Sequence, residues 1–170
     1  MALYLIPNGA MQTTAALVAV ATGTAIKTML QVKTGATTIL KIVEWGISFD
    51  GSAAATPGKV ELIETDVAAT VTASVANDIT KYDAAALLQG DPTTALIAVG
   101  TSSTGYTASA EGTITAVRNL DPPQFIAPTN QFVKQFPLGR EPVINNGKFG
   151  RIRVTFGTTV NAYCWMVVEV

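Results

Sequence analysis

The segment Ile39–Gly51 reads ILKIVEWGISFDG, and this stretch decides the fold class. β-Branched and aromatic residues dominate it, and these residues are enriched in strands. It ends at Asp50-Gly51, a dipeptide that is typical of a turn. A glycine inside a strand marks a bulge or a close approach of another group to the backbone. The segment therefore predicts a long twisted strand over Thr37–Phe49, bulged or bent at Gly46, with Trp45 mostly buried.

Shorter β-rich segments lie on both sides of this strand. In Thr24–Lys33, side chains alternate in character with a period of two, which predicts a strand whose even-numbered residues, from Ile26 to Val32, are buried. Gly100–Ala110 is predicted to be a loop. Asn146-Gly147 predicts a type I′ hairpin turn that joins Glu141–Ile144 to the following strand. The other predicted strands are Lys59–Thr65, Val67–Val75, Ala95–Val99, Glu111–Leu120, Lys148–Phe156 and Asn161–Val170. Phe125–Pro137 is predicted to be extended, with its ends at Pro128 and Pro137 in an edge strand or a loop.

The number and spacing of these segments indicate the fold class. Roughly eight to ten short strands with turn signals between them are typical of an all-β sandwich or barrel. The chain has 170 residues and no visible linker, so a single domain over residues 1–170 is predicted.

Charged residues are sparse. They make up 14% of the chain, compared with about 25% in an average globular protein. A surface with few ions is easily desolvated, which favours a protein that lies against other subunits. The alternative is a sandwich with a Thr-rich exterior, because Thr suits strands. The net charge of −1 and the lack of a basic stripe argue against binding to nucleic acid or to anionic membranes.

The N-terminal stretch Thr13–Thr24 resembles the apolar part of a signal peptide. The first positively charged residue is Lys27, however, so the basic region that precedes such a segment is missing. The stretch is also too short and too polar to span a membrane. We therefore expect the chain to be made and kept in the cytoplasm.

The residues for catalysis or metal binding are few. The chain has no histidine and one cysteine, Cys164, so neither an intrachain disulfide, nor a structural zinc site, nor a Cys-His nucleophile is expected. Cys164 lies in an apolar strand and is predicted to be a small buried hydrophobe. We predict no catalytic residue, no cofactor and no metal ligand, and the chain is not expected to be an enzyme.

Two patterns resemble binding sites but lack essential parts. Gly100–Gly105 has the glycine spacing of a phosphate-binding loop, without the lysine or the following helix that such a loop requires. Glu61, Glu64 and Asp66 lie close together, but alternation places the two glutamates on opposite strand faces. They are interpreted as a solvated edge, with a cation site as the alternative.

Three arginines, Arg140, Arg151 and Arg153, form the main basic cluster. Arg151 and Arg153 share one strand face because their spacing is two. Arginine is the cation that protein interfaces favour, so we predict an intersubunit or capsid contact at these three residues. The alternative is a ladder of ion pairs across strands, each of which contributes little.

Four aromatic residues are interpreted as core, with a carbohydrate pocket as the alternative. They are Trp45, Phe156, Tyr163 and Trp165.

Several segments together resemble the capsid decoration, or cement, proteins of tailed bacteriophages. The resemblance spans Thr37 to the C-terminus. The segments that carry it are Val43–Gly51, Val60–Leu62, Thr65–Val67, Ala108–Thr113, Ala127–Gln131, Gln135–Pro142, Arg151–Val154 and Asn161–Cys164.

This resemblance implies an antiparallel β-sandwich of the jelly-roll type, frequently a homotrimer, bound to the outside of the capsid. The implied partners are the major capsid protein and further copies of the chain, and no catalytic residues come with the resemblance. Residues 1–14 are interpreted either as an extended arm that docks on the shell or as the first strands. The alternative function is a carbohydrate-binding β-sandwich module associated with a phage tail or a cell surface.

Overall fold

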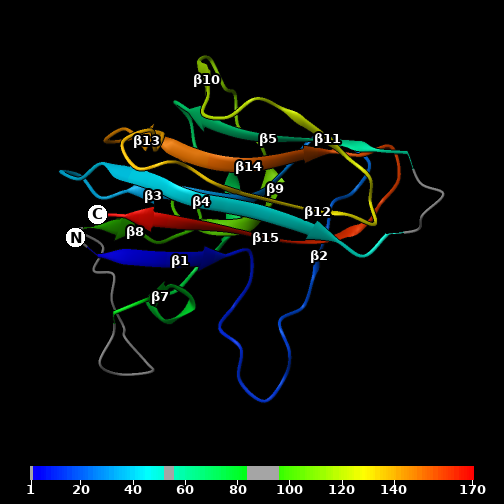
Figure 1. The fold of residues 1–170 in the computed structure, drawn as a ribbon, viewed down its shortest axis with the longest axis horizontal. Helices are drawn as coiled ribbons and strands as arrows, with labels where there is room; N and C mark the ends of the chain where they lie inside the picture. Colours follow the sequence, from blue (N-terminus) through cyan, green and yellow to red (C-terminus); the bar gives the residue numbers. More distant parts are fainter. Residues whose placement is uncertain (1, 52–55, 84–95) are drawn as a thin grey trace.

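The computed structural model describes residues 2–51, 56–83 and 96–170, which form two antiparallel sheets packed face to face (Figure 1). Sheet 1 contains β1 (Leu3–Pro7), β2 (Val20–Ala21), β4 (Leu40–Phe49), β7 (Thr80–Lys81), β12 (Gln131–Gln135), β13 (Val143–Ile144) and β15 (Asn161–Glu169). Sheet 2 contains β3 (Lys27–Thr34), β5 (Gly58–Thr65), β6 (Thr70–Ala73), β8 (Ile97–Ala98), β9 (Gly105–Ala110), β10 (Val117–Asn119), β11 (Gln124–Ile126) and β14 (Phe149–Thr155). One short 3₁₀ helix, η1 (Ala76–Asp78), precedes β7.

The long strands pair in a nested order. The first pairs with the last (β1 with β15), β3 with β14, and β4 with β12, while β5 pairs with β10 and β11. Sheet 1 therefore has the order β12-β4-β15-β1-β7, and sheet 2 has the order β10-β5-β14-β3-β9-β6. This nesting is that of a jelly-roll sandwich. It confirms the predicted fold class.

The core lies between the two sheets and draws residues from both. Trp45 is fully buried, as predicted, and its ring contacts Phe132 with 5.0 Å between centroids. The indole N–H of Trp45 donates a 3.1 Å hydrogen bond to the buried carboxylate of Asp121, so the polar atom of this large side chain is satisfied.

The irregularity in β4 lies at Val43 and not at Gly46. Val167 pairs with Glu44 and Val168 with Ile42, so Val43 is the extra residue. Gly46 stays in register and is instead a site of close approach, because a β-carbon there would be 2.3 Å from the ring of Trp165. Of the two roles predicted for this glycine, the bulge was wrong and the close approach is confirmed.

Burial in β3 departs from simple alternation. Met29 and Gln31 are buried together with the even-numbered residues, whereas Ile26 is exposed. The side chain of Gln31 accepts a hydrogen bond from the amide of Ala69 and donates one to the carbonyl of Ser103. Both faces of this strand are therefore covered, which a period of two within one segment does not reveal.

One loop prediction and one strand prediction were wrong, and the prediction of a hairpin turn was partly right. The predicted loop at Gly100–Ala110 contains β9, and the predicted strand at Glu111–Leu120 is regular only over Val117–Asn119. Asn146-Gly147 does form a turn, with Lys148 N–H bonded to the Asn145 carbonyl. Only the glycine has a positive φ, so the turn is not type I′, and it connects β13 of sheet 1 to β14 of sheet 2.

The N-terminus enters the sheet immediately. Leu3–Pro7 forms β1, with Tyr4 and Ile6 buried in the core, so the interpretation of residues 1–14 as an arm was wrong for this part. A projecting segment does follow, from Asn8 to Ala19, and it extends away from both sheets (Figure 1).

Candidate functional site

The side chain of Arg151 is buried in the interior of the protein. It has an exposed fraction of 0%, and Nη1 donates to the carbonyl (3.1 Å) and to the carboxylate (3.3 Å) of Glu111. Nη2 donates to the carbonyl of Val67. Burial lowers the pKa of Arg151 below its ordinary value, and the Glu111 carboxylate opposes that shift. Arg151 therefore fastens two connecting segments to sheet 2, and its guanidinium is not at the surface of this chain.

The other two arginines have separate surroundings. Arg153 donates a 3.1 Å hydrogen bond to Glu61, its register partner on β5, and Lys59 forms a second ion pair with the same carboxylate. Arg140 is exposed in the connection between β12 and β13. The ion pair across strands therefore describes Arg153, whereas Arg151 pairs with a connecting segment and Arg140 is exposed.

The carboxylates around β5 are buried or engaged in structural hydrogen bonds. Glu61 and Glu64 are buried, so their interpretation as a solvated edge was wrong; β14 covers one side of β5, and β10 and β11 cover the other. Asp66 accepts hydrogen bonds from the Thr115 hydroxyl and from the amides of Thr115 and Ala116. Within the described residues, no three His, Cys, Asp or Glu side chains are grouped to hold a metal ion.

The glycine-spaced segment Gly100–Gly105 is a structural turn. The carbonyl of Ser103 accepts a 2.6 Å hydrogen bond from the Gln31 side chain, and the segment continues into β9 instead of a helix. Phosphate-binding loops rely on a helix N-terminus after the glycines. The turn therefore lacks the geometry of that site.

The four aromatic residues divide between the core and the surface. Trp45 and Phe156 are buried, as predicted. Tyr163 and Trp165 are half-buried, because along β15 they alternate with the core residues Cys164 and Met166 and project from the outer face of sheet 1. The interpretation of Tyr163 and Trp165 as core was wrong.

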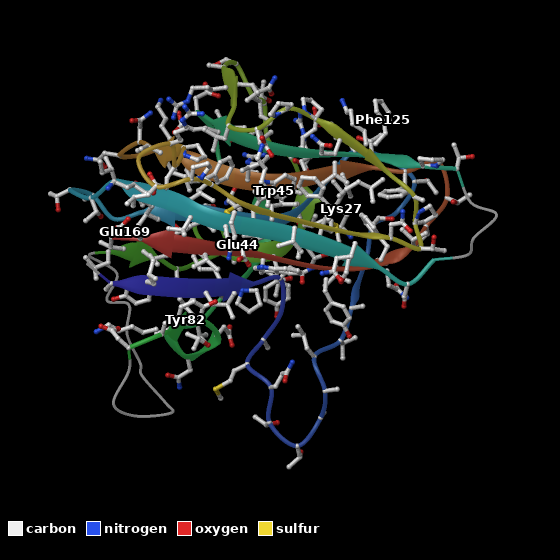
Figure 2. The ribbon with its side chains drawn as sticks, viewed as in Figure 1. Lys27, Glu44, Trp45, Tyr82, Phe125 and Glu169 are labelled. Atoms are coloured by element: carbon white, nitrogen blue, oxygen red, sulfur yellow. The ribbon has the colours of Figure 1, made fainter. Side chains whose placement is uncertain are left out.

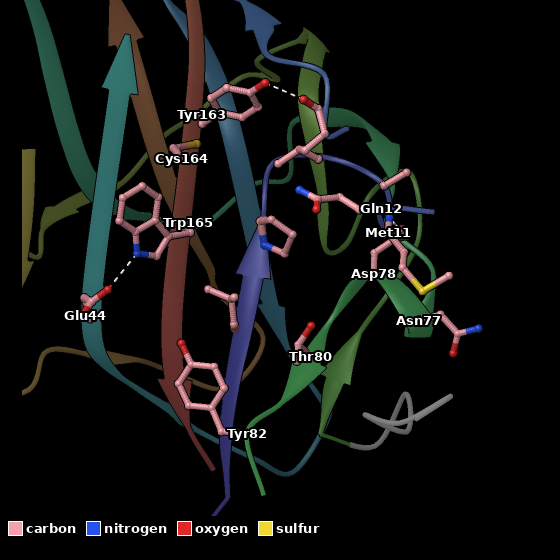
Figure 3. Close-up of a pocket in the computed structure, with 14 residues that line it drawn as sticks. Met11, Gln12, Glu44, Asn77, Asp78, Thr80, Tyr82, Tyr163, Cys164 and Trp165 are labelled. Carbon is pink, nitrogen blue, oxygen red and sulfur yellow. Dashed lines mark hydrogen bonds between the residues drawn. The ribbon is translucent and has the colours of Figure 1, made fainter. Parts of the chain in front are cut away.

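A cleft of about 680 Å³ lies on this outer face (Figure 3). Its floor consists of outward side chains of β1 and β15: Leu5, Pro7, Tyr163 and Trp165. The projecting segment, η1 and β7 lie together along one side, where the Met11 amide is bonded to Asp78, and Glu44 lies on the other side (Figure 3). The cleft joins parts of the chain that are far apart in sequence.

Hydrogen bonds fix the walls of the cleft. The indole N–H of Trp165 donates to Glu44 Oε1 at 2.8 Å, and the Gln135 side chain donates to Glu44 Oε2 at 2.8 Å. The Tyr163 hydroxyl donates to the carbonyl of Leu17. Figure 3 shows the hydrogen bonds made by Tyr163 and by Trp165. They hold β4 and the projecting segment against the floor.

Two carboxylates give the cleft a negative charge. Asp78 accepts hydrogen bonds from the amides of Met11 (2.7 Å) and Val75 (2.8 Å), and Glu44 accepts from the neutral donors described above. Burial, followed by the charge of Glu44, raises the pKa of Tyr82 above its ordinary value. The ion pairs found among the described residues include neither Glu44 nor Asp78, and no lysine or arginine of that part lines the cleft.

Sequence reasoning missed this cleft, although one signal was present. In Asn161–Glu169, aromatic and small or aliphatic residues alternate with a period of two, which places Tyr163 and Trp165 together on one face. The sequence of this segment does not show whether that face of the strand lies in the core or on the surface. That depends on which sheet face packs against the other sheet.

Comparison of the chain with protein-family models, with curated proteins and with solved structures found no match. None of the described residues belongs to a helix with the length and apolar character needed to cross a membrane.

Proposed function

We propose that this chain is a structural protein of a tailed-phage particle. It binds the outside of the capsid and stabilises the shell by bridging major capsid subunits. The resemblance of several segments to capsid decoration proteins motivates the proposal. The observation that carries it is the projecting segment Asn8–Ala19, which has the composition and the anchoring of a protein-contact element.

The projecting segment carries no charge. The first charged side chain of the chain is Lys27, and residues 10–16 and Val18 are exposed, with Val18 at 77%. Burying such a segment against a partner removes no ion from water, and exposed apolar groups gain free energy when they are covered. An uncharged projection that exposes Met11 and Val18 among small residues suits a protein-contact surface.

Both ends of the segment are fixed to the sandwich. Asn8 exchanges side-chain hydrogen bonds with the backbone of Ala162 (3.1 Å) and Cys164 (3.0 Å) on β15. Thr22, just beyond the segment, exchanges bonds with Val160. A loop that is held at both ends loses less conformational freedom when it binds, so more of the contact energy appears as affinity.

Further copies of the chain are the second proposed partner. Phe125 on β11 is 77% exposed and projects into solvent from the edge of sheet 2 (Figure 2), and Leu138 is 94% exposed. A closed ring would cover such groups and the sheet edges, which supports a homotrimer. Light scattering of the purified chain tests this proposal. A monomer at high concentration, with no association with capsids, would reject it.

The proposed location is the exterior of the virion, after synthesis in the host cytoplasm, with neither nucleic acid nor membrane as a partner. The alternative, a carbohydrate-binding module, has one observation in its favour: Tyr163 and Trp165 line the cleft on sheet 1. Glycan-array binding would distinguish this alternative from capsid binding.

Co-sedimentation with particles that lack the protein tests the main proposal. We expect the wild-type chain to sediment with the particles. Val18→Asp, which places a charge on the projecting segment, should reduce occupancy. Ile39→Asp is the matched control, because Ile39 is an exposed aliphatic residue in the connection between β3 and β4, outside the projecting segment, and it should retain occupancy. If the wild-type chain stays in the supernatant, the proposal is wrong; if Val18→Asp binds fully, the segment is not the contact.

A further inference from the structure

The charge of the cleft on sheet 1 is unbalanced. Glu44 and Asp78 both line it, and their hydrogen bonds come from an indole, an amide side chain and two backbone N–H groups. Neutral donors satisfy the oxygen atoms without neutralising the charge. A carboxylate that is partly removed from water attracts a cation more strongly than a fully solvated one does. The electrostatics therefore favour a positively charged ligand.

The walls of the cleft suit a cation that is carried on an apolar stem. Leu5, Pro7 and Leu17 offer aliphatic surface, and the aromatic rings of Tyr82 and Trp165 lie on the side of Glu44 (Figure 3). Lysine and arginine side chains bury their methylene stems along apolar surface and keep the charged group at a polar or aromatic site. The volume of about 680 Å³ also lies in the range of ordinary ligand sites.

The same geometry is less suited to a sugar. Stacking on a sugar requires a free ring face, and hydroxyl recognition uses both donors and acceptors. The ring of Trp165 already lies over Gly46, and its N–H is bonded to Glu44. The hydroxyl of Tyr163 is bonded to Leu17. The charged groups of the cleft are two carboxylates, which a cation matches better than a neutral polyol does.

We propose that this cleft accepts a lysine or arginine side chain of a partner protein, with the Glu44 carboxylate and the Tyr82 ring holding the charged group. This inference rests on the proposed function in that the partner is taken to be a protein. It adds the chemistry of the contact. The projecting segment forms one wall of the cleft, so a partner that covers the segment can also reach Glu44.

The test is NMR titration of the indole N–H signals. The chain has two tryptophans, and only Trp165 lines the cleft, so Trp45 in the core is an internal reference. The probes are Nα-acetyl-lysine methylamide and Nα-acetyl-arginine methylamide, with Nα-acetyl-norleucine methylamide as the neutral isostere and methyl glucoside as the sugar. We expect a saturable shift of Trp165 with a cationic probe, weaker at high salt, and no comparable shift with the neutral probes.

Variants assign the effect to the cleft. Glu44→Gln removes the charge and keeps an acceptor for the indole, and it should weaken binding of the cationic probe about tenfold or more. Tyr82→Ala removes a 55% exposed ring without touching the core and should also weaken binding. Glu141→Gln, a charge-matched change away from the cleft, should bind like the wild type. The absence of a shift with both cations, an equal shift with norleucine, or unchanged binding by Glu44→Gln would overturn the proposal. A shift with the glucoside alone would favour the carbohydrate alternative.

Particle binding separates this inference from the proposed function. If the wild-type chain sediments with particles and Glu44→Gln and Tyr82→Ala do so equally well, the capsid role stands and the cationic contact is wrong. If the cationic probes bind but the wild-type chain never associates with particles, the site stands and its partner is a different protein.

Discussion

The ring of Trp165 lies directly over Gly46, its register partner on the neighbouring strand, and a β-carbon at position 46 would be 2.3 Å from Trp165 Cζ2. The backbone of Gly46 has no positive φ, so glycine is required there by packing and not by conformation. This contact sets the height of the indole above sheet 1 and thereby places its N–H against Glu44.

Gly46→Ala should therefore destabilise the fold. Forcing one carbon into this contact is expected to lower the free energy of unfolding by about 1–3 kcal/mol. Gly157→Ala is the control, because nothing lies within 4 Å of its β-carbon position, and it should change stability by no more than about 0.5 kcal/mol. Urea denaturation measures both variants. Equal stability of Gly46→Ala and the wild type would show that the ring moves aside freely.

Arg151 should matter for folding more than any exposed arginine does. Arg151→Ala removes the cation that pairs with the Glu111 carboxylate, which keeps only its bonds from Thr28, and it takes the side-chain donor from the Val67 carbonyl. Removing one partner of a buried ion pair costs about 3–5 kcal/mol. Arg140→Ala, at an exposed position, should stay within about 0.5 kcal/mol of the wild type. Thermal unfolding of the two variants is the measurement, and similar values would contradict the internal role of Arg151.

The carboxyl of Asp66 should have an unusually low pKa. The Thr115 hydroxyl, followed by the amide of Ala116, lowers the pKa of Asp66 from 3.8 to about 2. Because the folded pKa lies below the unfolded one, the stabilising contribution is complete above pH 3.8 and is lost as the pH falls through about 2. The stability difference between the wild type and Asp66→Asn should shrink over that interval. ¹³C NMR should also show that Thr115→Val raises the pKa; an unchanged value would rule out the hydroxyl as the cause.

Cys164 should be unreactive in the folded chain. The side chain is buried, and burial raises the pKa of its thiol well above the ordinary value, so little thiolate forms. A maleimide reagent should modify the chain rapidly in denaturant and very slowly in native buffer. Rapid labelling under native conditions would mean that β15 opens readily at Cys164.

The sequence was sufficient for features that depend on one segment. It predicted the strand around Trp45, the burial of that ring, the turn at Asn146-Gly147 and the all-β class, because local propensity and period carry that information. The prediction that this turn joins two paired strands of a hairpin was wrong. The strands on either side of it belong to different sheets, and pairing between distant segments is not written in either strand alone.

The candidate site depended almost entirely on long-range structure. The burial of Arg151 requires the segments at Val67 and Glu111 to fold over sheet 2. The cleft likewise requires Glu44, Asp78 and Trp165, which come from three different parts of the chain, to meet on one face. The alternation in β15 groups Tyr163 with Trp165, but no pattern in the sequence shows that Glu44 and Asp78 join them.

The thermal stability of phage particles with and without the chain shows directly whether this protein stabilises a capsid. The measurement is the temperature at which particles release their DNA, first for particles that lack the protein and then after purified chain is added. We predict that added wild-type chain raises the release temperature to that of complete particles, and that the effect saturates once the capsid sites are filled. An unchanged release temperature at saturating chain would contradict the proposal that this protein stabilises a capsid.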